Sequence, residues 1–302
     1  MDVIIENDKL KVKTNTHGGE MISLLSKKSN EEYLWQGVPF WWKIYCPTLF
    51  PVIGKVKQFQ YSYDGEKYFM PEHGFASRAK YLLLNKSKDE VSFELKNNKE
   101  TEKIYPFKFS LITKYKLEDN KVVISFKVSN LDNKDIYFSI GSHPAFKCPM
   151  YGEEDALADY YLSFEKNEKL SKKEINKNDF LTGNDIEYLK DTNKIDISQE
   201  TFNDGTLIFN NLKSKFVELK SKKHNKSVKI NFEEFDILSI WAPDRDARFI
   251  CIEPWMGHAD YEDFHGEIKD KEGIITLSPN KEFNISYSIE INEWYIGNAV
   301  KI

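Results

Sequence analysis

Residues 283–291 read Phe-Asn-Ile-Ser-Tyr-Ser-Ile-Glu-Ile, so apolar and polar side chains alternate along the whole stretch. Successive side chains of a β-strand point to opposite faces, and the alternation predicts a strand with one buried face and one wet face. Residues 122–129 and 216–220 show the same pattern. Helical periodicity is scarce, and residues 153–160 are one of few short candidates for a helix.

Polar turns separate the predicted strands. Asp64-Gly65 divides two aromatic segments within residues 61–68, a combination typical of a two-residue hairpin turn. Residues 117–121 indicate a second hairpin. Many short strands joined in this way predict an all-β fold, a large β-sandwich with short helices only.

Residues 165–200 lack the alternation, and we expect them to form a long excursion between strands. Within this region, the lysine-rich residues 165–178 are interleaved with acidic ones, which is typical of a solvated loop or face. No linker rich in proline or glycine divides the chain, and no repeat is visible. The sequence therefore predicts one domain over residues 1–302.

Composition narrows the classes of function. The 302 residues carry a net charge of -5 without a long basic patch, which argues against a nucleic-acid partner. Aromatic residues make up 14% of the chain and suit both strands and stacking on sugar rings. The three cysteines are widely spaced and imply neither a disulfide framework nor a zinc-ligand pair. No apolar stretch is long enough for a membrane span, so we expect a soluble, cytoplasmic protein.

Two residues stand out as candidates for proton transfer. His143 precedes Pro144 at the predicted end of a strand, where a histidine can exchange protons near neutral pH. Glu253 lies among apolar residues, and burial would raise its pKa and suit it to act as a general base. The alternatives are a structural histidine in a turn and a glutamate that faces solvent or pairs with an arginine.

Other polar residues suggest ligand contacts. His73 and Arg78 flank a Gly-Phe-Ala-Ser stretch in which Gly74 allows close approach to a ligand, although a turn with an exposed arginine explains it equally well. Lys55 and Lys57 follow Gly54, a pattern also typical of a buried strand and a solvated turn. His258 and His265 lie among acidic residues, and an acidic surface loop explains them better than a metal site.

Taken in order, these segments resemble the aldose 1-epimerase (galactose mutarotase-like) superfamily, and the LacX-type branch most closely. The likeness covers nearly the whole chain. It rests on residues 18–24, 33–37, 49–51, 73–76, 141–146, 204–207, 240–241 and 251–255. It implies the supersandwich of that superfamily, a large, twisted, antiparallel β-sandwich with an open sugar-binding cleft.

The resemblance also implies roles for individual residues. Glu253 would remove the proton of the anomeric hydroxyl, and His143 would protonate the ring oxygen. His73 would contact the sugar, and Asp204 is the nearest match to an aspartate that binds sugar hydroxyls. We expect an aromatic wall that includes Phe75, Trp241 or Trp255.

Two departures from the superfamily pattern concern the substrate. Typical mutarotases carry Asn-Arg after the early glycine turn, whereas this chain has Lys55 and Lys57 there and no arginine. Hexose-6-phosphate epimerases often read His-Gly-Phe-Ala-Arg, whereas Ser77 takes the arginine position here and Arg78 follows. Either lysine is a candidate to replace the arginine contact.

The sequence therefore favours a mutarotase that interconverts the α and β anomers of a free aldohexose. Ring opening needs one base and one acid, ideally an ionised carboxylate beside a protonated imidazole, and requires no cofactor or metal. Two alternatives are a hexose-6-phosphate 1-epimerase, with Lys55, Lys57 and Arg78 on the phosphate, and a catalytically silent carbohydrate-binding protein. The expected partner is a monosaccharide, without nucleic acid or membrane, and monomer and homodimer both stay open.

Overall fold

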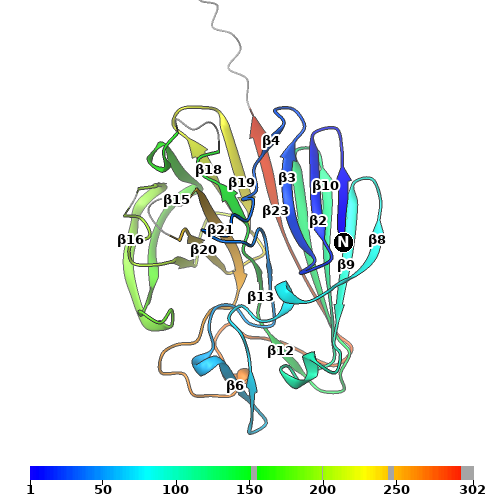
Figure 1. The fold of residues 1–302 in the computed structure, drawn as a ribbon. Helices are drawn as coiled ribbons and strands as arrows, with labels where there is room; N and C mark the ends of the chain where they lie inside the picture. Colours follow the sequence, from blue (N-terminus) through cyan, green and yellow to red (C-terminus); the bar gives the residue numbers. More distant parts are fainter. Residues whose placement is uncertain (151–154, 199, 244–247, 294–302) are drawn as a thin grey trace, which may run out of the picture.

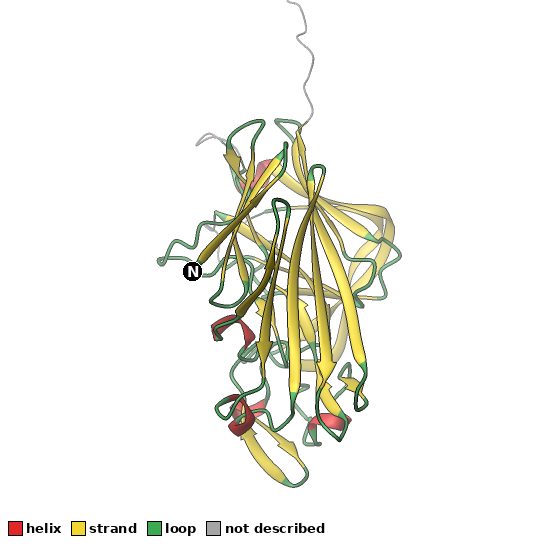
Figure 2. Cartoon of the chain, turned by 90° about the vertical axis from the view of Figure 1, so that its right-hand side faces the viewer, coloured by secondary structure: helices red, strands yellow, loops and turns green. Residues whose placement is uncertain are grey.

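Strands dominate the structure, a computed structural model that describes residues 1–150, 155–198, 200–243 and 248–293 (Figures 1 and 2). The named strands pair antiparallel throughout, and the helices described are single 3-10 turns. These turns are η1 (Lys57–Phe59), η2 (Ala76–Arg78), η3 (Thr101–Lys103), η4 (Leu157–Asp159) and η5 (Ile268–Asp270). The predicted all-β fold is confirmed. Of the helix candidate at residues 153–160, only the η4 turn is seen, and residues 153 and 154 lie outside the described residues.

A nine-stranded sheet runs from the β16–β15 hairpin, at the left of Figure 1, to β8 at the right. Its strands, in spatial order, are β16 (Leu181–Asp196), β15 (Tyr160–Ile175), β18 (Phe216–Ser221), β19 (Lys226–Asn231), β23 (Glu282–Glu293), β11 (Lys121–Asn130), β10 (Phe109–Glu118), β9 (Glu90–Lys96) and β8 (Leu82–Lys86).

Smaller sheets pack against this one. A four-stranded sheet holds β1 (Asp2–Glu6), β2 (Leu10–Asn15), β3 (Glu20–Ser26) and β4 (Glu31–Glu32). A second sheet holds β17 (Leu207–Asn210), β20 (Ile237–Trp241), β21 (Phe249–Met256), β13 (Ile140–Ser142) and β5 (Thr48–Leu49), with β14 (Ala145–Lys147) also paired to β21. Two ribbons complete the fold, β6 (Gln60–Tyr63) with β7 (Glu66–Phe69) and β12 (Ile136–Phe138) with β22 (Ile275–Leu277).

The alternating stretch at the C-terminal end forms β23, which lies between β11 and β19. Ile285, Tyr287, Ile289 and Ile291 are buried in the main core, while the residues between them are partly exposed. Both predicted hairpins are present as β6–β7 and β10–β11. Asp64 and Gly65 take positive φ values of 52° and 79°, as a two-residue turn requires when it joins strands with a right-handed twist.

The expectation for residues 165–200 is wrong, because β15 and β16 pair through most of this region as a long hairpin. Register shifts interrupt the ladder at four points, the first between Ser163 and Glu168. The buried positions of β15 keep their period of two, but two of them carry the charged residues Glu168 and Lys172, and most of β16 is exposed. Apolar and polar residues therefore do not alternate in the sequence although the strands persist.

Candidate active site

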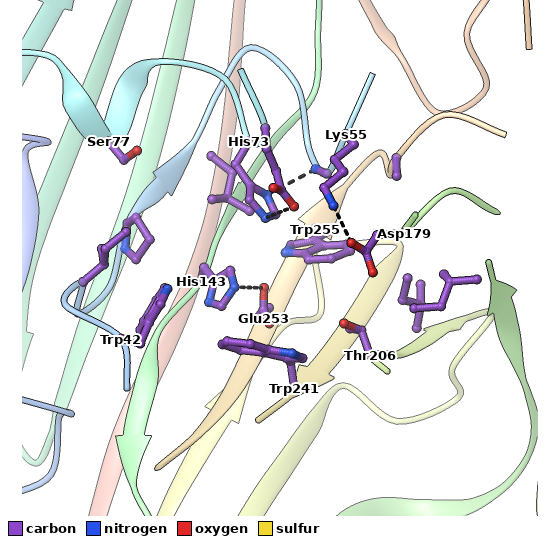
Figure 3. Close-up of a pocket in the computed structure, with 18 of the residues that line it drawn as sticks. Trp42, Lys55, His73, Ser77, His143, Asp179, Thr206, Trp241, Glu253 and Trp255 are labelled. Carbon is purple, nitrogen blue, oxygen red and sulfur yellow. Dashed lines mark hydrogen bonds and ion pairs between the residues drawn. The ribbon is translucent and has the colours of Figure 1, made fainter. Parts of the chain in front are cut away.

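Three neighbouring strands, β17, β20 and β21, form the floor of a cavity of about 350 Å³ (Figure 3). In their register, Ser239 of β20 lies opposite Glu253 of β21. Alternate residues of β21 take opposite sides, so Ile250 and Ile252 enter the main core whereas Glu253 and Trp255 line the cavity. A carboxylate in mid-strand therefore faces the cavity and not solvent.

His143 reaches Glu253 from the short connection between β13 and β14 (Figure 3). Its backbone N–H donates to the carbonyl of Pro47, which fixes the connection beside the cavity. Its Nε2 lies 3.2 Å from Oε2 of Glu253, and the two side chains are 10% and 1% exposed. Two residues that are 110 positions apart in the chain thus lie in contact in a buried site.

Burial controls the protonation of this pair. Removal from water raises the pKa of Glu253 well above its usual range. Burial also lowers the pKa of His143 well below its usual value, and His73 adds to the shift. Burial therefore disfavours, in the ligand-free protein, the ion pair expected from the sequence.

His73 lies next to this pair, with its ring centroid 5.6 Å from that of His143. Its Nδ1 accepts the backbone N–H of Gly54 at 3.2 Å, so the neutral ring carries its proton on Nε2. Burial, with the charges of Arg78 and Lys55, lowers its pKa to about 4. His73 therefore offers a hydrogen-bond donor at neutral pH.

The backbone explains why glycine follows this histidine. Gly74 has a φ of 73°, and a Cβ there would lie 2.1 Å from the carbonyl oxygen of Phe50. Any larger residue would collide with the chain that passes behind the cavity.

Three tryptophans form the walls of the cavity: Trp42, Trp241 and Trp255. Trp42 was not predicted, and it stacks on the imidazole of His143 at a centroid distance of 4.8 Å. Its carbonyl oxygen accepts the indole N–H of Trp35 at 2.6 Å, which holds this part of the chain against the site. Two adjacent tryptophans at positions 41 and 42, outside any alternating pattern, were the available signal.

Charged residues surround the mouth of the cavity. Lys55 forms an ion pair with Asp179, which lies in the turn between β15 and β16 (Figure 3). Arg78 also lines the cavity and donates to the carbonyl of Gly74, and Glu72 lies close to both cations. Asp179 was missed because its position depends on the hairpin that the sequence pattern concealed.

Three expected residues do not line this cavity. Phe75 packs in the main core against Phe50, Tyr105 and Phe109. Asp204 is 83% exposed and pairs with Lys172, and Thr206 from the same motif lines the cavity instead. Lys57 turns away and donates to the carbonyl of Glu262, so Lys55 is the lysine that reaches the cavity.

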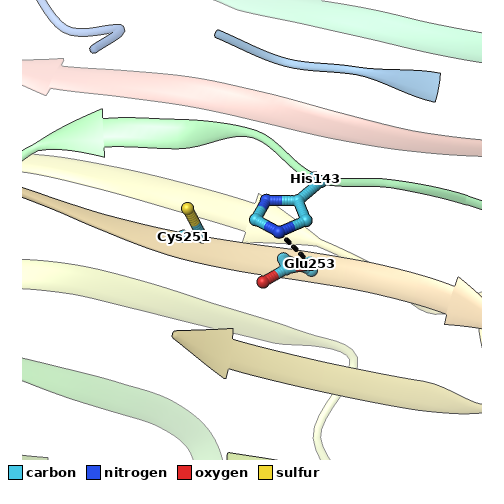
Figure 4. A group of neighbouring side chains, drawn as sticks. All are labelled: His143, Cys251 and Glu253. Atoms are coloured by element: carbon cyan, nitrogen blue, oxygen red, sulfur yellow. Dashed lines mark ion pairs between the residues drawn. The ribbon is translucent and has the colours of Figure 1, made fainter. Parts of the chain in front are cut away.

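Potential metal ligands gather at one place among the described residues. His143, Cys251 and Glu253 each place a ligand atom within 4.8 Å of the others (Figure 4). The histidines of residues 258–265 do not form such a group in the part of the chain described: His258 contacts the carbonyl of Ala259, and His265 contacts Lys57. None of the helices described has the length and apolar character needed to cross a membrane.

Comparison with known proteins identifies the family. The model of the aldose 1-epimerase family matches residues 1–276. The plasmid-encoded protein LacX of Lactococcus lactis subsp. lactis is 29% identical over 299 residues, which cover 96% of this chain and 99% of LacX.

Two solved structures have the same fold over nearly their whole length. A galactose mutarotase related enzyme from Lactobacillus acidophilus superposes with a TM-score of 0.92 at 32% identity. The match covers 97% of this chain and 98% of the Lactobacillus acidophilus chain. A galactose mutarotase-like protein from Lactobacillus casei has a TM-score of 0.91 at 31% identity, with coverage of 97% and 100%. The resemblance inferred from the sequence is confirmed, and the chain belongs to the aldose 1-epimerase family.

Proposed function

We propose that this protein is an aldose 1-epimerase that interconverts the anomers of a free aldohexose, with Glu253 as base and His143 as acid. The observation that carries the proposal is the buried contact of 3.2 Å between the two groups. It lies at a cavity of about 350 Å³, which is large enough for one hexose ring.

Anomerisation opens the ring to an aldehyde, rotates one bond and closes the ring on the other face. Opening removes a proton from the anomeric oxygen and adds one to the ring oxygen. Glu253 accepts the first proton and His143 donates the second, and closure reverses both transfers. The pair therefore holds one proton throughout: on His143 before opening and on Glu253 while the chain is open. Each group contributes about 10²–10⁴-fold to the rate.

Sugar binding must move the shared proton from Glu253 to His143 before the ring can open. Both carboxylate oxygens of Glu253 are buried in the ligand-free protein, and apart from the 3.2 Å contact of Oε2 with His143 neither has a hydrogen-bond partner among the described residues. Hydroxyl groups of a bound sugar supply such partners, and hydrogen bonds to the charged form of a carboxylate lower its pKa. The substrate thereby creates the ionic form of the pair that reacts with it.

The charges at the mouth favour a free sugar over a sugar phosphate. Asp179 already neutralises Lys55, and Glu72 lies near Arg78. A phosphate group would meet two carboxylates along with the two cations. The presence of both proton-transfer groups, in contact, supports an enzyme over a silent binding protein. A cytoplasmic location fits the three free cysteines at positions 46, 148 and 251.

NMR exchange spectroscopy across a panel of aldoses and their 6-phosphates tests the proposal. We expect exchange between the anomers to accelerate for at least one free aldohexose and to respond less to its 6-phosphate. Acceleration confined to the phosphates would favour the hexose-6-phosphate epimerase. Tight binding without acceleration of any sugar would favour the carbohydrate-binding protein.

A further inference from the structure

Cys251 lies two residues before Glu253 on β21, and both side chains take the same side of the strand. His143 approaches them from the β13–β14 connection, and the three ligand atoms lie within 4.8 Å of one another (Figure 4). The group combines a thiol, an imidazole and a carboxyl, a donor set that suits zinc once the thiol and the carboxyl have released their protons to solvent on binding.

Each donor has bonding capacity that the protein leaves unused. Among the described residues, Nδ1 of His143 and Oε1 of Glu253 are buried without a hydrogen-bond partner, and Oε2 of Glu253 has only its 3.2 Å contact with Nε2 of His143. Cys251 is a free thiol at 0% exposure among apolar residues. Buried polar atoms are normally satisfied, so unsatisfied atoms on two of three adjacent donors call for a ligand.

We propose that His143, Cys251 and Glu253 form a binding site for Zn²⁺ or a similar thiophilic divalent cation, and that occupation of this site inhibits the enzyme reversibly. Tetrahedral bonds of about 2.0–2.3 Å place ligand atoms roughly 3.3–3.8 Å apart. Nε2 of His143 and Oε2 of Glu253, at 3.2 Å, already have nearly this separation, and a ligand atom of Cys251 lies within 4.8 Å of the other two. The fourth coordination position would face the cavity, which His143 and Glu253 line.

Inhibition rests on the proposed function, since the ion would occupy the lone pairs that carry the shared proton. Nε2 of His143 could no longer protonate a ring oxygen, and Glu253 could no longer accept a proton. Sugar and metal would therefore compete for the same groups. Cys251 takes no part in proton transfer, so its loss should remove the metal site and leave catalysis intact.

The first experiment measures binding without any reference to activity. Purified protein is stripped with a chelator and titrated with Zn²⁺ by calorimetry, and with Co²⁺ as a spectroscopic substitute. We expect one ion per chain and a thiolate-to-cobalt charge-transfer band in the near ultraviolet. Cys251→Ala should abolish the band and weaken Zn²⁺ binding by more than about 100-fold, because losing even an outer-shell partner costs about 10–100-fold. The matched control is Cys148→Ala, another buried free thiol, which should behave as the parent.

The second experiment measures anomerisation with Zn²⁺ present. The parent and Cys148→Ala should be inhibited and should recover when the chelator is added, whereas Cys251→Ala should retain its rate. Absence of the cobalt band, or equal zinc affinity in the parent and Cys251→Ala, would overturn the site. Metal binding by a protein that anomerises no sugar would refute only the proposed function, so the two failures are distinguishable.

Discussion

Replacing Glu253 by glutamine tests the base directly. Glutamine has nearly the shape of the protonated carboxyl that burial favours in the ligand-free protein, so the cavity should persist. It cannot accept a proton, however. A general base contributes about 10²–10⁴-fold, or about 3–5 kcal/mol of the barrier. We expect a loss of rate toward the upper end of this range, because the other two carboxylates at the cavity are poorly placed to replace the base. Asp179 pairs with Lys55, and Glu72 lies beside His73.

The assay is steady-state anomerisation of the preferred sugar, together with calorimetric binding of the same sugar. Glu253→Gln should lower kcat by roughly 10³–10⁴-fold and change the binding constant only a few-fold, because the lost transfer occurs in the transition state. The double variant with His143→Asn should be little worse than the poorer single variant, since the two groups move one proton between them. Asp204→Asn is the control, because Asp204 is exposed outside the cavity, and it should match the parent.

The same variant also tests the protonation of the pair. A carboxyl whose folded pKa is raised favours folding below its unfolded value of 4.5 and loses that contribution as pH rises through the folded pKa. The parent should therefore lose stability relative to Glu253→Gln as pH increases, which thermal unfolding at several pH values measures. A Glu253→Gln protein that turns over at the parent rate would refute the mechanism and leave a binding protein as the better interpretation.

Three further changes probe the surroundings of the pair. The pH profile of kcat/KM should be flat through 6.5, the ordinary pKa of histidine. The lowered pKa of His143 moves the acid limb to lower pH, and the raised pKa of Glu253 moves the alkaline limb to higher pH. A limb near pH 6.5 would contradict this. His73→Asn should raise KM more than it lowers kcat. The parent should lose up to roughly 3 kcal/mol of its free energy of unfolding as pH falls from 6.5 to about 4, because the pKa of His73 is lowered in the folded protein; this is an upper limit, since the side chain is 25% exposed. The His73→Asn variant should not show this loss. Trp42→Leu should lower kcat by roughly 2–30-fold and move the acid limb of the profile to still lower pH, because an indole face stabilises an imidazolium by about 0.5–2 kcal/mol. A change in KM alone would show that Trp42 only contacts the sugar.

The fold was accessible from the sequence wherever one face of a strand is buried and the other is wet. β23 shows this clearly, since four of its residues enter the core at every second position. β15 and β16 could not be predicted, because the buried face of β15 carries Glu168 and Lys172 and most of β16 is exposed, so local composition does not separate this hairpin from a solvated loop. Asp179 was lost with them, since it reaches the cavity only as part of that turn.

At the site, reasoning from the sequence identified types of residue more reliably than positions within a motif. Asp204 and Thr206 belong to one four-residue motif, yet it is the threonine that lines the cavity. Phe75 follows His73 by two residues, but its ring enters the core and leaves the aromatic wall to tryptophans. Which residue of a loop faces a cavity depends on backbone angles such as the positive φ of His73, and composition does not encode these.

The proposed acid–base pair is buried and its backbone is held on both sides, which limits proton exchange with solvent. Glu253 lies in mid-strand opposite Ser239 of β20, which restricts the movement of its backbone, and the backbone N–H of His143 donates to the carbonyl of Pro47. Two rigid groups in a buried site exchange protons poorly with solvent, which would hinder an enzyme that needs a net proton each turnover. Anomerisation needs none, because every proton taken from one oxygen is returned when the ring closes. A buried pair that holds a single proton throughout the cycle is therefore sufficient for the proposed interconversion of anomers.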